Sequence, residues 1–270
     1  MEALRQVDEW PAENVAVAVL RKAETIAVRG EREQVFRWAS VTKPVTALAV
    51  LVAAEEGALE LDDPAGPPGS TVRHLLAHAS GLPFEGAEPI APPGTRRIYS
   101  NAGFDILGDH LAEAAGMPFA DYLDQAVLRP LELNAELRER PGQGLWGSLD
   151  DLTRIAVELQ SPKLVAPETL AEATSVQYEG LGGVLPEFGR FDPNDWGLGV
   201  ELKGTKDPHW TGSRTSARTF GHFGGSGTFL WVDPDAGVAL GCLTDREFDP
   251  WAKEAWPLLS DAVLTELNGS

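Results

Sequence analysis

The stretch SVTKPVTALAVLVAAEEG, residues Ser40–Gly57, predicts a buried helix from which the rest of the chain can be placed. No glycine interrupts residues 40–56, and Gly57 is the residue type that commonly ends a helix. Apolar residues recur at helical spacing at Val45, Leu48, Ala49 and Val52. Pro44 fits this prediction because the first turn of a helix has free N–H groups. We therefore expect a core helix that begins near Ser40.

Segments on both sides of this helix predict strands. Alternation in Val15–Leu20 and a second apolar stretch at Thr25–Val28 predict an antiparallel hairpin. Near the other end, Thr228–Val232 and Val238–Leu243 predict two more strands joined by a DPDAG turn. A last helix is expected to begin near Asp249–Pro250.

Helical patterns fill the middle of the chain. They cover residues 72–76, 104–115, 119–128 and 149–159. The order strands, helices, strands predicts an α+β fold. We expect an antiparallel sheet built from both termini, residues 1–39 and 180–270, and flanked by helices. The mainly helical region of residues 40–179 should lie beside this sheet within one unit.

Charge and composition exclude several classes of function. The 270 residues carry 22 Lys+Arg against 41 Asp+Glu, so the formal net charge is −19, which argues against nucleic-acid and membrane partners. The single cysteine, Cys242, cannot form an internal disulfide, and the first residues lack a basic-then-apolar signal pattern. These features predict a cytoplasmic protein, and they leave the oligomeric state open.

The first segment that could carry chemistry is Ser40–Val41–Thr42–Lys43. Ser40 and Lys43 would lie one helical turn apart on the same face, so that a nucleophile and a base could touch. Desolvation of Lys43 would help it to lose its proton and to activate the hydroxyl. An N-cap serine followed by a solvated lysine gives the same pattern, so this motif alone decides nothing.

Two further segments could supply the rest of a site. Tyr99 and Asn101 follow a Pro/Gly-rich loop, where a phenol beside an ammonium could have a lowered pKa and share the serine proton. His222 opens a strand whose Gly224 and Gly225 let the backbone approach a ligand, and the Gly225 N–H could complete an oxyanion hole. Taken singly, a turn asparagine with a half-buried tyrosine and a glycine bulge are the more common explanations of these segments.

Taken in order, however, the three motifs S-x-x-K, Y-x-N and H-x-G, the last followed by GGSGTFLWVDPDAG, resemble the serine β-lactamase and penicillin-binding-protein superfamily. The resemblance is greatest to class C β-lactamase-like serine hydrolases and esterases. It extends through segments such as FRWASVTK, HLLAHASGLP, PGTRRIYSNAGFDILG and WGLGV, and so covers nearly the whole chain. The fold that it implies is the β-lactamase/transpeptidase-like fold.

The resemblance also implies a role for each motif residue. Ser40 would be the acylated nucleophile, with Lys43 as its base and Tyr99 as a second proton-transfer group. Asn101 would hold Lys43 and the substrate, and His222 would stand where many relatives have the lysine of K-T-G. The N–H groups of Ser40 and Gly225 would form the oxyanion hole. No metal and no organic cofactor would be needed.

One departure from the family pattern bears on the substrate. Relatives usually carry Thr or Ser after the Lys or His of the third motif, where the pair grips a substrate carboxylate, but this chain has Phe223. Arg214 and Arg218, in the preceding loop, could take over that anion-binding role, although surface arginines are more often solvated.

The function expected from these residues is a serine hydrolase that cleaves a small ester or amide through an acyl-enzyme on Ser40, with a β-lactam as at most a slow or accidental substrate. One alternative is a D-alanyl carboxypeptidase or D-amino-acid peptidase of the same fold. Another is a non-catalytic relative that binds a peptide or metabolite.

Other candidate residues are assigned structural places. His74 and His78 are expected to pack rather than to bind metal, because the pair lacks the glutamate of H-E-x-x-H. His209 is expected on the surface. Among the tryptophans, Trp38 and Trp196 are expected near the cleft.

Overall fold

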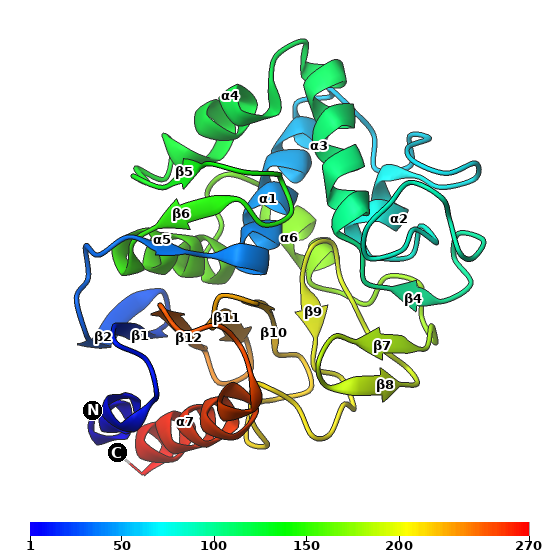
Figure 1. The fold of residues 1–270 in the computed structure, drawn as a ribbon. Coiled ribbons are helices and arrows are strands. Elements are labelled where there is room, and N and C mark those ends of the chain that lie inside the picture. The colour runs from blue at the N-terminus through cyan, green and yellow to red at the C-terminus, as the bar shows by residue number, and fades with distance from the viewer. Residues whose placement is uncertain (270) are drawn as a thin grey trace.

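The computed structural model describes residues 1–269, and a six-stranded antiparallel sheet lies at its centre (Figure 1). The strand order is β2-β1-β12-β11-β10-β9. The strands are β1 Val15–Arg21, β2 Glu24–Arg29, β9 Glu201–Leu202, β10 Phe220–Gly224, β11 Thr228–Asp233 and β12 Val238–Thr244. Because β1 pairs with β12, the two ends of the chain build one sheet, as predicted.

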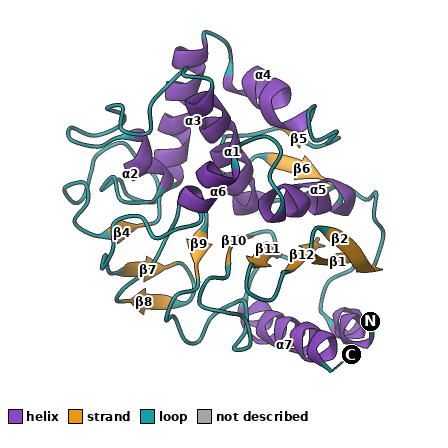
Figure 2. Ribbon diagram, turned by 180° about the vertical axis from the view of Figure 1, so that it is seen from behind, coloured by secondary structure: helices purple, strands orange, loops and turns teal. Residues whose placement is uncertain are grey.

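Helices cover both faces of this sheet (Figures 1 and 2). On one face lie α1 Thr42–Glu55 and α5 Leu149–Gln160, and on the other lie η1 Glu2–Glu9 and α7 Pro250–Asn268. Strand β1 shows the consequence: Ala16 and Ala18 belong to the α1/α5 core, whereas Val17 and Val19 pack with the α7 side. A strand buried on both faces needs an apolar residue at every position.

Further helices lie around α1 (Figure 2). They are α2 Val72–Leu76, α3 Asn101–Ala115, α4 Phe119–Leu123 with its continuation η3 Asp124–Leu128, and α6 Pro167–Ala173. Helix α3 ends at Ala115, as the pattern over residues 104–115 predicted, and Gly116 adopts φ 66° as its left-handed C-cap. No helix among residues 1–269 combines the length and the apolarity that crossing a membrane requires.

Two small sheets were not predicted. One joins β3 Phe36–Arg37, β5 Glu136–Leu137 and β6 Leu145–Gly147, and the other joins β4 Arg97–Ile98, β7 Gly183–Leu185 and β8 Gly189–Phe191. Each strand has two or three residues, too few for an apolar alternation to emerge from the sequence. These short strands nevertheless matter, because they position residues around the groove above the central sheet.

Candidate active site

Ser40 lies in the short 3-10 turn η2, Ala39–Val41, which leads directly into α1. Neighbouring segments hold this turn in place: the Trp38 indole N–H donates to the Gly147 carbonyl at 3.1 Å, and the Leu145 N–H donates to Thr42 Oγ1 at 3.0 Å. Ala39 adopts φ 46°, a left-handed conformation that alanine rarely takes and that surrounding contacts must enforce. The strained residue thus immediately precedes the candidate nucleophile.

Lys43 lies one turn further along α1 and is fully buried. Its Nζ atom is 3.3 Å from Ser40 Oγ, 2.7 Å from Asn101 Oδ1 and 2.8 Å from the Gly142 carbonyl oxygen. Burial lowers the pKa of Lys43 to about 7, as the sequence predicted in direction. A neutral amine has two hydrogens and one lone pair. The two carbonyl oxygens take the hydrogens, which leaves the lone pair for the Ser40 hydroxyl.

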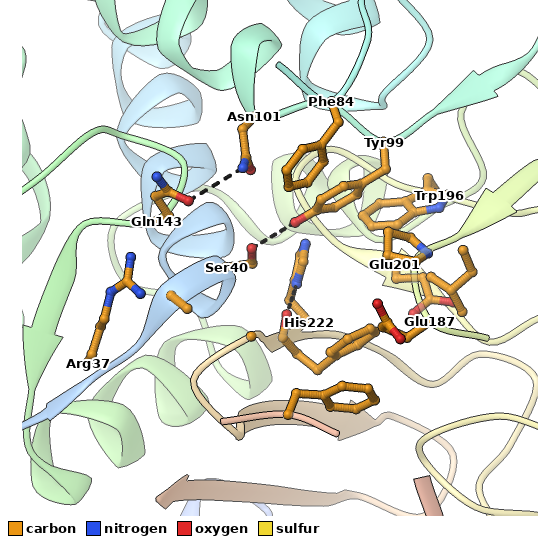
Figure 3. A pocket seen from close by; sticks show the side chains of 16 residues that line it. Arg37, Ser40, Phe84, Tyr99, Asn101, Gln143, Glu187, Trp196, Glu201 and His222 are labelled. Atoms are coloured by element: carbon orange, nitrogen blue, oxygen red, sulfur yellow. Dashed lines mark hydrogen bonds between the residues drawn. The ribbon is translucent and has the colours of Figure 1, made fainter. Parts of the chain in front are cut away.

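Tyr99 approaches Ser40 from the other side. Its hydroxyl donates to Ser40 Oγ at 2.8 Å, and its ring lies 4.9 Å from Lys43 Nζ (Figure 3). The expectation that the pKa of Tyr99 would be lowered is wrong, because burial of the phenol raises that pKa well above its usual value. Tyr99 is therefore a proton donor at neutral pH, and Lys43 is the group that can accept.

The start of α3 positions both Tyr99 and Asn101. Ser100 caps this helix by accepting from the Gly103 N–H at 2.9 Å, so Asn101 becomes its first residue. Asn101 Nδ2 donates to Glu85 Oε1 at 3.1 Å, which fixes the amide with Oδ1 toward Lys43. His78 packs beneath, with its ring centroid 4.5 Å from that of Tyr99.

His222 presents an unused hydrogen-bond acceptor to the site. Its Nδ1 lies 2.7 Å from the Phe223 carbonyl, which can only accept, so Nδ1 carries the proton and Nε2 is bare. Nε2 is buried without a partner among residues 1–269, and the ring points toward the Ser40 and Tyr99 hydroxyls (Figure 3). Burial and nearby Lys43 lower the pKa of His222 to about 3. The group at the position of the relatives' cationic lysine is therefore neutral here.

Gly224 ends β10 beside the nucleophile turn, and Gly225 follows it. A Cβ atom on Gly224 would lie 2.4 Å from the Trp38 carbonyl oxygen and 3.1 Å from Ala39 Cβ, so only glycine lets the two segments meet. Gly225 has open space at the same place. Ser40 and Gly225 both line the pocket, so the two residues border the same space.

Gly224→Ala is therefore expected to destabilise the protein by about 1–3 kcal/mol through overpacking. Thermal unfolding should show a lower Tm, whereas Gly225→Ala should leave the Tm within experimental error because its methyl group meets no atom within 4 Å. An equal effect of the two substitutions would contradict the packing described for β10.

These groups line a cavity of about 270 Å³ (Figure 3). Ser40, Tyr99, Asn101, His222 and Gly225 all contribute to its wall, and Lys43 lies just beneath. Of the two tryptophans expected near the cleft, Trp196 lines the cavity and Trp38 is buried below it. The motifs gave no indication of further lining residues, which include Arg37, Phe84, Gln143, Glu187 and Glu201.

A buried ionic network behind the cavity was also missed. Glu201 accepts from the Trp210 indole at 2.5 Å, lies 3.0 Å from His209 Nε2 and pairs with Lys206 at 3.2 Å. Burial opposes ionisation of Glu201, but Lys206 and His209 outweigh it and lower its pKa to about 2. The surface position expected for His209 is wrong, since 4% of this residue is exposed. The two-residue strand β9 gave no pattern from which this network could be recognised.

Arg214 and Arg218 do not reach the cavity. Arg218 pairs with Asp235 at 2.8 Å on the surface, and the exposed Arg214 is held through its backbone N–H by Asp261 Oδ1 at 2.8 Å. The loop that carries them turns toward α7 rather than toward Ser40, so these arginines are solvated, the more common alternative, and do not bind an anion at the cavity. Arg37 is the guanidinium in the cavity wall, and it is paired with Glu139 at 3.0 Å.

The other histidines lie in packed surroundings. His74 hydrogen-bonds Thr71 at 2.9 Å, and its ring stacks on Tyr178 with centroids 4.5 Å apart. His78 Nδ1 accepts from the Ser100 N–H at 3.2 Å. Within residues 1–269, no group of three or more His, Cys, Asp or Glu side chains is arranged to hold a metal ion.

The sequence profile of one protein family, described as Beta-lactamase, matches residues 6–137 and 132–264 of this chain. The chain belongs to the beta-lactamase family. Among solved structures, this family member is similar to a beta-lactamase (Mb2281c) from Mycobacterium bovis, with 50% identity, a TM-score of 0.96 and 98% of each chain covered. The predicted family and the α+β fold are thereby confirmed.

Curated relatives of this beta-lactamase family member include an esterase and a carboxypeptidase/endopeptidase. Esterase EstB from Burkholderia gladioli is 27% identical over 89% of this chain and 85% of its own length. The D-alanyl-D-alanine-carboxypeptidase/endopeptidase AmpH from Escherichia coli (strain K12) is 31% identical over 38% of this chain and 37% of its own length. The chain is a serine hydrolase of the beta-lactamase family, as the motif order predicted.

Proposed function

We propose that this serine hydrolase is an esterase whose acyl-enzyme forms on Ser40. Ser40 Oγ attacks the ester carbonyl while its proton passes to Lys43 Nζ, and the N–H groups of Ser40 and Gly225 stabilise the oxyanion. The Tyr99 hydroxyl protonates the departing alkoxide, and the Lys43 ammonium restores the Tyr99 proton. Water then attacks the ester of Ser40, and the same transfers run in reverse.

The observation that carries this proposal is the arrangement of hydrogen bonds around Lys43. When Lys43 is neutral, Asn101 Oδ1 and the Gly142 carbonyl accept its two hydrogens, and its lone pair faces Ser40 Oγ. As an ammonium, Lys43 would also donate to Ser40 Oγ, which can accept two hydrogen bonds and would then accept from both Lys43 and Tyr99. When Lys43 is neutral, Ser40 can donate to it while accepting from Tyr99, and this is the state that nucleophilic attack requires.

The polarity around the reacting centre favours a neutral ester over a D-peptide with a terminal carboxylate. His222 is neutral and offers an acceptor, and Phe223 is apolar. Glu187 and Glu201 also line the cavity, and the lysines nearest to them, Lys253 and Lys206, are already paired with them. Arg37 is already paired with Glu139. A carboxylate bound near Ser40 would therefore lose its hydration without gaining a free cationic partner. The similarity to esterase EstB along 89% of the chain supports the same choice.

A substrate panel tests this assignment. Turnover should be measured for a short-chain 4-nitrophenyl ester, a peptide ending in D-alanyl-D-alanine and the chromogenic β-lactam nitrocefin. We expect the highest kcat/KM for the ester, with acylation by nitrocefin slower. The proposal is wrong if the peptide is hydrolysed with a higher kcat/KM than the ester.

We also propose the cytoplasmic location that the single cysteine predicts. Cys242 is a free thiol buried in β12, where burial raises its pKa, so it depends on no oxidising compartment. Fractionation of the producing cells, with detection of the chain in the cytoplasmic fraction, checks this location.

A further inference from the structure

A second hollow opens beside the catalytic cavity and shares three of its lining residues. It measures about 340 Å³, and Phe84, Tyr99 and Pro186 line both spaces. Phe84 stacks on Tyr99 with ring centroids 5.9 Å apart, so one aromatic wall runs from Ser40 outward (Figure 3). A substrate acylating Ser40 can therefore extend an arm into this hollow, which we call the side groove.

Residues of the small sheet β4-β7-β8, which Figure 1 locates in the fold, line the side groove. Ile98 pairs with Val184 and Val184 pairs with Arg190, so these three side chains stand in one row on the same face. Arg96 precedes Ile98 by two residues and belongs to this face, whereas Arg97 belongs to the other. The Arg97 guanidinium is accordingly buried, and it donates to the carbonyls of Ala77 and Gln177 at 2.5 and 2.7 Å.

The side groove gathers large apolar side chains that remain exposed to solvent. Phe84 is 52% exposed, Ile90 57% and Val184 55%, and all three line this hollow. Few large apolar side chains of the described chain are so exposed, and an apolar patch gathered next to a catalytic cavity marks a binding surface. An aliphatic chain would cover these side chains.

Two guanidinium groups accompany the apolar residues. Arg96 and Arg190 line the side groove, both are exposed, and neither forms an ion pair with any acidic group of residues 1–269. Arg96 donates only to the neutral Ile90 carbonyl, at 2.9 Å. Glu187, the carboxylate at the junction with the catalytic cavity, lies 3.6 Å from Lys253. On a protein of net charge −19, two free guanidinium groups beside one groove provide a local site for an anion.

We infer that the side groove binds an aliphatic arm of the substrate that ends in a carboxylate or another anionic group, which Arg96 and Arg190 hold. This inference rests on the esterase function proposed above and names its substrate class: a neutral ester at Ser40 with an anion at the far end of an apolar chain. The anionic end of the substrate would lie in the side groove and not in the catalytic cavity, where His222 and Glu201 disfavour negative charge.

The test compares half-esters of 4-nitrophenol with straight-chain diacids of increasing length and the same compounds with the distal carboxylate methylated. Release of 4-nitrophenol reports cleavage at the same bond in both series. At the best length, we expect the wild-type kcat/KM to favour the free carboxylate by about tenfold, the size that a charge-assisted hydrogen bond gives. Added salt should reduce this preference because both guanidinium groups are exposed.

The variant Arg96→Gln/Arg190→Gln should lose this preference. The matched control Arg214→Gln/Arg218→Gln removes the same charge from a loop outside both hollows and should keep it. The inference is overturned if wild type prefers the methylated probes at every length, or if both double variants change the ratio equally.

A binding measurement separates this inference from the proposed function. The same probes can be titrated calorimetrically into the Ser40→Ala protein, with and without Arg96→Gln/Arg190→Gln. Tighter binding of the carboxylated probe that depends on the two arginines supports the side groove even if wild type turns over no ester. Equal affinity for both probes rejects the side groove even if esters are hydrolysed rapidly.

Discussion

Ser40→Ala is expected to lower kcat for a short-chain 4-nitrophenyl ester by about 10⁴–10⁶-fold, since loss of a nucleophile removes the covalent route. Ser40 Oγ lies 2.8 Å from the Tyr99 hydroxyl and 3.3 Å from Lys43 Nζ, so it is the hydroxyl placed between the two proton-transfer groups. Initial rates of 4-nitrophenol release measure the effect.

The matched control for this variant is Ser226→Ala. Ser226 also lies near the nucleophile turn, but its hydroxyl donates to the Arg37 carbonyl at 2.7 Å rather than to a proton-transfer group. Thermal unfolding should show that both variants are folded. Activity of Ser40→Ala within tenfold of wild type would remove Ser40 from the mechanism.

Lys43→Met is expected to lower kcat/KM by about 10²–10⁴-fold, the contribution of a positioned general base. Methionine fills similar apolar space along α1 but has no lone pair that can take the Ser40 proton. Lys43→Arg should be similarly inactive because a guanidinium stays protonated at neutral pH. If Lys43→Arg kept activity while Lys43→Met lost it, the residue would act as a fixed positive charge and not as a base.

The pH dependence of wild type follows from the same residue. Burial disfavours the ammonium and lowers the pKa of Lys43 to about 7, so the neutral base is lost as the pH falls through 7. We expect kcat/KM to rise with pH in one step centred near 7. His222 contributes no step above pH 5 because its pKa is lowered to about 3. A flat profile between pH 5 and 8 would contradict the role given to Lys43.

The features that the sequence predicted well depend on residues that lie close together in the chain. Ser40 and Lys43 are three residues apart, so helix geometry alone brings them together once a helix is recognised. The long strands β11 and β12 were recognised because their apolar runs are bounded by a clear turn. The three motifs came together only through the family resemblance, because nothing in the spacing of Lys43 and Asn101 requires that they meet.

What the sequence missed depends on backbone groups and on very short strands. The Gly142 carbonyl, which completes the contacts of Lys43, belongs to a residue without a side chain and has no sequence signature. The tautomer of His222 is set by the Phe223 carbonyl, which local backbone geometry alone brings to Nδ1. Arg190 reaches the side groove through a three-residue strand whose pairing cannot be read from its own sequence.

Intact-protein mass spectrometry after exposure to a fluorophosphonate reports whether Ser40 is the nucleophile. We expect one covalent adduct, mapped by peptide digestion to Ser40, with a labelling rate that increases with pH around 7 and is strongly reduced in Lys43→Met. Labelling at another residue, or none at all on the folded wild-type protein, would show that Ser40 is not the nucleophile.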